Sequence, residues 1–74
     1  EDLLDQELVL TELAWADRPV SGPVLAQCSA HGEARSGALD GSVLRWDAPQ
    51  PRVAPGQSVA LYEADQVLGG AIVA

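Results

Sequence analysis

The chain of 74 residues contains no lysine, no methionine, no phenylalanine and a single cysteine, Cys28. One cysteine excludes a disulfide within the chain and fits a reducing compartment. One cysteine and one histidine are also too few for a structural zinc site, which needs four ligands. The absence of lysine excludes a lysine-attached biotinyl or lipoyl group. No apolar run reaches the roughly 18 residues of a membrane-spanning helix, and no secretory leader is visible.

Basic residues are scarce, because four arginines stand against eleven Asp and Glu residues and give a formal net charge of −7. A domain that grips phosphates is normally basic, whereas this one should repel polyanions at long range. The composition therefore argues against tight nucleic-acid binding by the isolated domain. The length allows one small domain, and the lack of any methionine indicates a piece of a longer protein.

The apolar residues alternate with a period of two, which is the signature of β-strands. We predict strands over 7–15, 24–31, 42–47, 58–62 and 67–74, with a short continuation over 33–39. Asp40-Gly41 has the residues of a two-residue hairpin, and Pro55-Gly56 those of a type II turn with positive φ at the glycine. Five or six short antiparallel strands at this spacing predict an all-β fold, a small closed or partly open β-barrel.

Several details of the barrel are also predicted. Leu44, Val59, Leu61 and Ile72 should form core because each lies mid-strand in an apolar run, and Glu12 should share a face with the leucines at positions 8 and 10. The prolines after residue 47 predict an extended crossing segment that cannot pair regularly. Glycines at 69 and 70 are expected where the barrel bends sharply or another backbone approaches closely.

No catalytic constellation is predicted. Cys28 and His31 are three residues apart, which puts them on opposite faces of a strand, and a buried structural thiol is the expected role. The carboxylates have no informative spacing, so they are interpreted as a solvated acidic surface. Trp15 and Trp46 have the rings needed to stack on a base, but a small domain more often uses such rings as core or rim filler.

The C-terminal part of the chain carries an ordered set of motifs: Pro-Gln with a following basic residue, Pro-Gly-Gln, a short strand that ends in tyrosine, and Leu-Gly-Gly. The residues concerned are Pro49, Gln50, Arg52, Pro55, Gly56, Gln57, Tyr62, Leu68, Gly69, Gly70 and Ile72. This set resembles the C-terminal end of bacterial tRNA-specific 2-thiouridylases of the MnmA type, formerly named tRNA (5-methylaminomethyl-2-thiouridylate)-methyltransferases. Upstream, ELVLTELAW resembles the strand that opens the family's last domain, and AQCSAHGEA resembles the next strand in a variant typical of actinobacterial members.

The resemblance implies that residues 7–74 form a non-catalytic C-terminal β-barrel domain, preceded by a linker remnant over 1–6. The parent enzyme would adenylate the wobble uridine of tRNA with ATP and then replace its oxygen with sulfur carried as a cysteine persulfide. This fragment itself would hold no cofactor and no catalytic residue. The implied partners are tRNA, the parent's N-terminal ATP-binding domain and a sulfur-relay protein, in the cytoplasm and without a membrane.

His31, Arg35 and Arg52 are the candidate tRNA contacts, provided that they lie on one face of the barrel. Many family members carry a basic Arg-Tyr-Arg type stretch where this chain has Ser-Ala-His-Gly-Glu over 29–33, so most of the positive charge is lost there. The alternative interpretation is a free-standing acidic β-barrel that serves as a binding or adaptor module.

Overall fold

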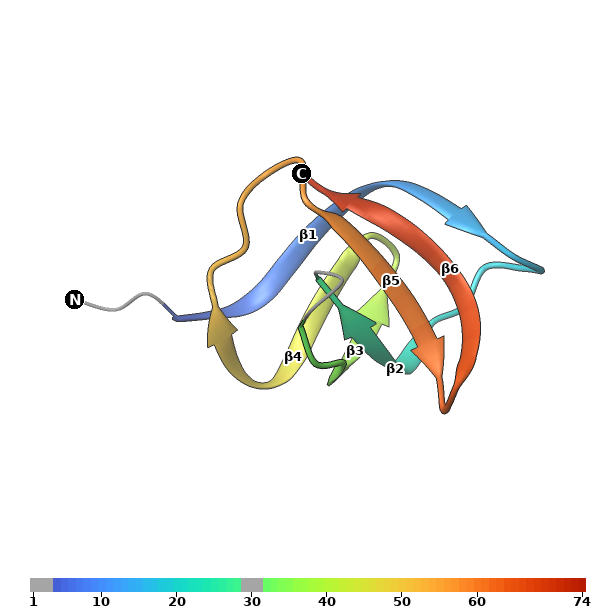
Figure 1. Ribbon diagram of the computed structural model, residues 1–74, viewed down its shortest axis with the longest axis horizontal. Helices are drawn as coiled ribbons and strands as arrows, with labels where there is room; N and C mark the ends of the chain where they lie inside the picture. The colour runs from blue at the N-terminus through green and yellow to red at the C-terminus, as the bar shows by residue number, and fades with distance from the viewer. Residues whose placement is uncertain (1–3, 29–31) are drawn as a thin grey trace.

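The computed structural model describes residues 4–28 and 32–74, which form six strands (Figure 1). The strands are β1 (Leu4–Trp15), β2 (Gly22–Gln27), β3 (Arg35–Asp40), β4 (Val43–Pro51), β5 (Ser58–Glu63) and β6 (Gln66–Val73). They close into a barrel in the order β1-β4-β3-β2-β5-β6, and β6 pairs back onto β1. All six pairings are antiparallel, which confirms the predicted all-β barrel. The described residues include no helix, and hence none long and apolar enough to cross a membrane.

Aliphatic side chains and one tryptophan fill the interior of the barrel. The buried hydrophobic residues are Leu8, Leu10, Val24, Ala26, Leu39, Leu44, Trp46, Val59, Leu61, Ala71 and Val73. Leu44 and Leu61 are fully buried and Val59 is nearly so, which confirms three of the four predicted core residues. Trp46, only 8% exposed, is a core residue as well, while Trp15 is half-buried against the edge of the core. Small barrels have interiors that side chains fill completely, as here.

The prediction that Ile72 is a core residue is wrong, because its side chain lies on the outside of β6 and is half-buried there. Its neighbours Ala71 and Val73 are the residues that point inward. Ile72 is paired with Ser58 of β5 and Thr11 of β1, and directly opposed residues share a face. The run GAIVA is apolar at every position, so its composition does not indicate which face turns inward.

A bulge in β1 changes which residues face the core. Glu12 has a φ of 53°, and the register of the pairing with β6 shifts around it. A bulge of this kind inserts one residue and moves the following side chains to the other face. Leu13 and Trp15 therefore pack against the core after the bulge, while Glu12 is exposed. The prediction that Glu12 shares the inner face of the strand is wrong.

β4 runs on to Pro51, and its pairing with β1 is irregular where the prolines predict it, because the register shifts between the Gln50 and Arg45 pairs. The pairing of β4 with β3 ends at Trp46, so the last residues of β4 have a partner only in β1, where Leu4 faces Pro51. Such an edge tolerates proline, because no strand on the other side needs its missing N–H donor. The same pairing makes residues 4–6, which fall in the predicted linker, part of β1.

The turn at 55–57 fastens the C-terminal strand. Gly56 has a φ of +88°, as predicted for a type II turn, and the Gln57 N–H donates to the Ala54 carbonyl at 3.3 Å. The Gly56 N–H donates to the Val73 carbonyl at 2.8 Å, and the Val73 N–H donates to the Gln57 carbonyl at 2.9 Å. The Pro-Gly-Gln motif thus joins the start of β5 to the end of β6.

The Gly-Gly pair marks the place where the backbone of β1 approaches β6. Gly69 faces Trp15, and Gly70 faces Ala14. A Cβ atom on Gly69 would overlap the Ala14 carbonyl oxygen and would lie 3.1 Å from the Trp15 Cα atom. The predicted close approach of another backbone is therefore confirmed at Gly69.

Candidate functional site

One end of the barrel carries a hollow of about 230 Å³, which Arg35, Cys28 and Trp46 help to line. Arg35 begins β3 at this end. Arg52 directly follows β4, between Pro51 and Val53, which both line the hollow. The structure thus brings two of the three candidate tRNA contacts to the same end of the barrel. The third candidate, His31, lies outside the described residues.

Each of the four arginines lies within 4.0 Å of a carboxylate oxygen. The pairs and their N–O distances are Arg18–Asp17 at 4.0 Å, Arg35–Glu33 at 3.8 Å, Arg45–Glu7 at 3.3 Å and Arg52–Asp5 at 3.4 Å. The Arg52 guanidinium also donates from Nη2 to the second oxygen of Asp5, at 3.5 Å. Every arginine therefore has an acidic neighbour.

The two ion pairs at this end of the barrel, Arg35–Glu33 and Arg52–Asp5, are exposed to solvent. The Arg35 side chain is 52% exposed and the Arg52 side chain is 68% exposed. Exposed ion pairs contribute only about 0–1 kcal/mol, so a phosphate group that approaches either guanidinium competes with the carboxylate at small cost. Two such groups are suited to local contacts with an anion, whereas the net charge of −7 opposes a long polyanion.

Cys28 lies beside the same hollow and is half-buried. Burial raises the pKa of its thiol, so the protonated form predominates at neutral pH. Reactive cysteines instead have a lowered pKa next to a cation or a helix N-terminus. The Cys28 carbonyl accepts a hydrogen bond from Gln57 Nε2 at 2.8 Å, which links the end of β2 to the turn before β5. Among residues 4–28 and 32–74, no group of three or more His, Cys, Asp or Glu residues is placed to hold a metal ion.

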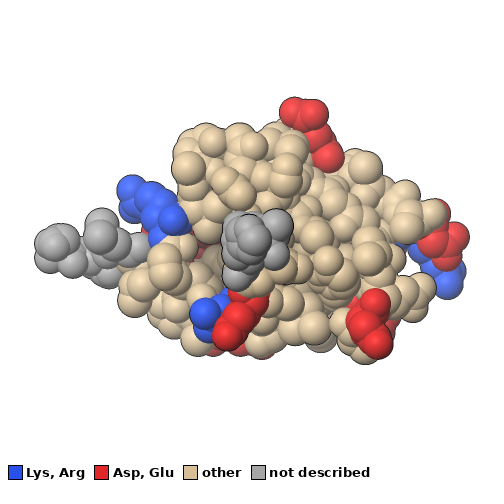
Figure 2. Space-filling view, in the orientation of Figure 1, with Lys and Arg blue, Asp and Glu red and all other residues tan. Residues whose placement is uncertain are grey.

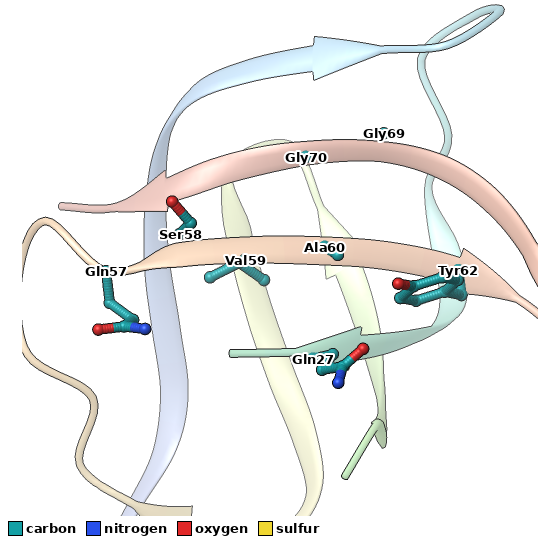
Figure 3. Close-up of a pocket in the computed structure, with 8 residues that line it drawn as sticks. All are labelled: Gln27, Gln57, Ser58, Val59, Ala60, Tyr62, Gly69 and Gly70. Carbon is teal, nitrogen blue, oxygen red and sulfur yellow. The ribbon is translucent and has the colours of Figure 1, made fainter. Parts of the chain in front are cut away.

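A second hollow, of about 310 Å³, lies on the outside of the barrel over β5 and β6. Its lining residues are all uncharged: Gln27, Gln57, Ser58, Val59, Ala60, Tyr62, Gly69 and Gly70. Figure 3 shows the Tyr62 ring and the Gln27 side chain on the neighbouring strands β5 and β2, beside a strip where Ala60 and Gly70 add little or no side chain. The sequence interpretation did not identify this surface. The available signal was the lack of charge from Gln57 to Tyr62 and from Val67 to the last residue.

The closed barrel of six short strands, with an interior filled by side chains, defines the chain as a small antiparallel β-barrel domain. The family to which it belongs is then given by its sequence. The chain belongs to the aminomethyltransferase beta-barrel domain family, whose model matches residues 5–73.

The curated relatives are longer proteins with one shared name, tRNA-specific 2-thiouridylase MnmA. The protein of Chlamydia abortus is 33% identical over 81 residues, which cover 96% of this chain and 22% of that protein. The protein of Janthinobacterium sp. is 38% identical over 78 residues, with 96% and 21% covered. The protein of Streptomyces griseus is 40% identical over 67 residues, with 81% and 18% covered. No solved structure matches the chain significantly.

These similarities confirm the family resemblance that the motifs indicate. The chain spans about a fifth of the length of the curated relatives it matches. The actinobacterial origin stays a prediction, because relatives of comparable similarity come from Chlamydia abortus and Janthinobacterium as well as from Streptomyces griseus.

Proposed function

We propose that this chain is the C-terminal, non-catalytic barrel domain of a tRNA 2-thiouridylase, an ATP-dependent enzyme that transfers sulfur to the wobble uridine of tRNA. The observation that carries the proposal is the match of the barrel family over residues 5–73, together with the shared name of the relatives. The barrel assists this enzyme by positioning tRNA or by packing on the catalytic domain. The alternative of a free-standing acidic adaptor has less support, because the relatives named above extend far beyond the matched region.

The chemistry of the proposed enzyme belongs to parts of the parent outside this chain. There, ATP would activate the uridine, and a cysteine persulfide would supply the sulfur. The parent's N-terminal ATP-binding domain and a sulfur-relay protein are the further proposed partners, and the cytoplasm is the proposed location.

The barrel's own contribution to tRNA binding is proposed to be local. Arg35 and Arg52, with His31, would contact phosphates at the end of the barrel. This is supported by the shared position of the two arginines beside one hollow and by the weakness of their exposed ion pairs. With a net charge of −7, the barrel leaves most of the affinity for tRNA to the rest of the parent.

The test is a double variant of the parent enzyme, Arg35→Ala with Arg52→Ala. We expect the apparent tRNA constant to rise and the log–log salt slope to fall by about one per lost phosphate contact, while ATP consumption per enzyme is retained. The matched control is Arg18→Ala with Arg45→Ala, which removes the same charge away from the hollow. The readout is 2-thiouridine in digested tRNA, measured by mass spectrometry at several salt concentrations.

Equal effects of the two double variants would show that tRNA binding depends on the net charge of the barrel and not on the arginines at its end. A parent enzyme from which the barrel has been deleted should thiolate tRNA poorly but still hydrolyse ATP. Unchanged thiolation by that deletion variant would contradict the assisting role.

A further inference from the structure

The outer surface of the barrel over residues 58–62 of β5 and their partners on β2 and β6 carries no charged side chain, and the exposed Glu12 of β1 lies at its border. Three cross-strand rows make up this surface, here named the uncharged face. The rows are Gln27–Ala60–Gly70–Ala14, Ser58–Ile72–Thr11 and Ser36–Leu25–Tyr62–Val67. None of these residues is buried, and directly opposed residues of antiparallel strands present their side chains on the same face. The uncharged face therefore extends across the strands on both sides of β5.

This lack of charge contrasts with the rest of the domain. A fifth of all residues are charged, with eleven carboxylates among the 74 positions. On the opposite side of the barrel, Glu7 of β1 faces Arg45 of β4, and the two form an ion pair at 3.3 Å. Figure 2 shows an uncharged tan surface to the right of the central grey atoms, between the acidic groups at the upper and lower right. Solvation alone would not require that a strongly acidic domain keep one contiguous face neutral.

Tyr62 stands in an outer row of the uncharged face, between two hollows. It lines the hollow of about 310 Å³ over β5 and β6, and also a third hollow of about 340 Å³ beside Leu25, where Asp47 and Glu63 mark the charged border of the face. Small side chains such as that of Ala60 surround the half-buried phenol ring. A tyrosine among small neighbours is typical of the centre of a protein interface, since the ring offers apolar area and its hydroxyl offers a hydrogen bond.

The composition of the face fits a protein partner better than RNA or a second copy. The core of a protein interface is depleted in charged residues and enriched in tyrosine, whereas an RNA-binding surface needs cations, and none of the four arginines lies in the three rows. A second copy would bring two acidic domains together, each with a net charge of −7.

We propose that the uncharged face docks onto the domain that precedes the barrel in the same polypeptide. This inference rests on the proposed function, because it requires the longer parent. About four-fifths of the length of the relatives lies outside the matched region, so a covalently attached partner is available at high effective concentration. Interfaces between domains of one chain bury about 600–1,500 Å², an area that a face across several strands of this barrel can supply.

Hydroxyl-radical footprinting of the full-length parent tests the docking, because side-chain oxidation at Tyr62 and Ile72 is read out by peptide mass spectrometry. The wild-type parent is compared with an Ala60→Glu variant, which puts a carboxylate in the centre of the face. The matched control is Ala48→Glu, at an exposed position of β4 outside the three rows and the hollows beside Tyr62. Each protein is labelled with and without tRNA and at two protein concentrations.

We expect Tyr62 to be labelled about tenfold more slowly in the wild-type parent and in Ala48→Glu than in Ala60→Glu, the factor that corresponds to about 1.4 kcal/mol of docking free energy. Protection should not depend on tRNA or on protein concentration. Protection that appears only with tRNA would identify an RNA-binding face, and protection that grows with concentration would identify a second copy. Either of these, or equal labelling in all three proteins, overturns the inference.

A separate thiolation assay keeps this inference distinct from the proposed function. If the wild-type parent thiolates tRNA but leaves Tyr62 fully labelled, only the docking inference fails. If it does not thiolate tRNA, the proposed function fails, whatever the footprint shows.

Discussion

Gly69→Ala is the substitution for which the structure makes its sharpest prediction. The added Cβ atom would overlap the Ala14 carbonyl oxygen and would lie 3.1 Å from both Cα and Cε3 of Trp15. Two of these three atoms belong to the backbone of β1, which cannot rotate aside as a side chain can. The substitution should therefore force β1 away from β6, the pair of strands that closes the barrel.

The expected cost follows from the geometry. Overpacking costs about 1–3 kcal/mol, and backbone contacts place Gly69→Ala at the upper end, at about 3 kcal/mol. A domain of this length has a free energy of unfolding of roughly 4–11 kcal/mol, at about 0.05–0.15 kcal/mol per residue. Each kcal/mol lowers the midpoint temperature of a domain this size by about 4–8 °C, so we expect a fall of roughly 12–24 °C.

The assay is thermal and urea unfolding of the 74-residue domain, followed by far-ultraviolet circular dichroism. Gly70→Ala is the matched control, since its Cβ atom would lie 3.3 Å from the Val59 carbonyl oxygen. That mild contact is offset by the roughly 0.5–1 kcal/mol that alanine gains over glycine within a strand. The reasoning is refuted if both variants unfold at the same midpoint, or if Gly69→Ala unfolds within a few degrees of the wild type.

Three further predictions use the same unfolding assay. Leu61→Ala should cost about 2–5 kcal/mol because it empties the core, and Ile72→Ala less than half as much because that side chain lies outside; equal losses would contradict the assigned faces. Gly56→Ala, at a φ of +88°, should destabilise by roughly 1–2 kcal/mol, and an unchanged midpoint would remove the argument from turn geometry. Ala64→Gly should stabilise by up to about 1 kcal/mol, because Ala64 has a φ of 54°. Ala38→Gly, its control in a regular strand, should destabilise by about 0.5–1 kcal/mol, so a loss of stability in both would count against strain at Ala64.

The sequence predicts the inner face where polar and apolar residues alternate clearly. Leu44 lies beside Arg45 in SVLRW and Leu61 lies beside the small Ala60 in SVALY, and both leucines are core residues. Ile72 lies in a run that is apolar throughout, so its face depends on its pairing with Ser58. The displacement of Glu12 depends on a bulge, which is a property of the paired strands and not of the local sequence.

The candidate site, too, is predictable from local sequence only in part. Arginines are visible in the sequence, but their partners are not, because Arg52 and Asp5 are 47 residues apart and meet only when β4 pairs with β1. The uncharged face combines short segments from five strands, and no single segment is unusual. It exists only through the registers that bring Gln27, Ala60 and Gly70 into one row.

The closed order of the strands has a consequence for the synthesis of this domain on the ribosome. β6 pairs with both β5 and β1, so the barrel cannot close before residues 66–73 have left the ribosomal exit tunnel. Until then β1 and β5 each present a row of unpaired amides and carbonyls, which are templates for pairing with other chains. Pairings between distant segments also form slowly and prolong the exposure of such edges. A nascent chain that stalls just before Gln66 would therefore form an open sheet instead of a smaller barrel. Its two edge strands, β1 and β5, would be free to pair with other chains.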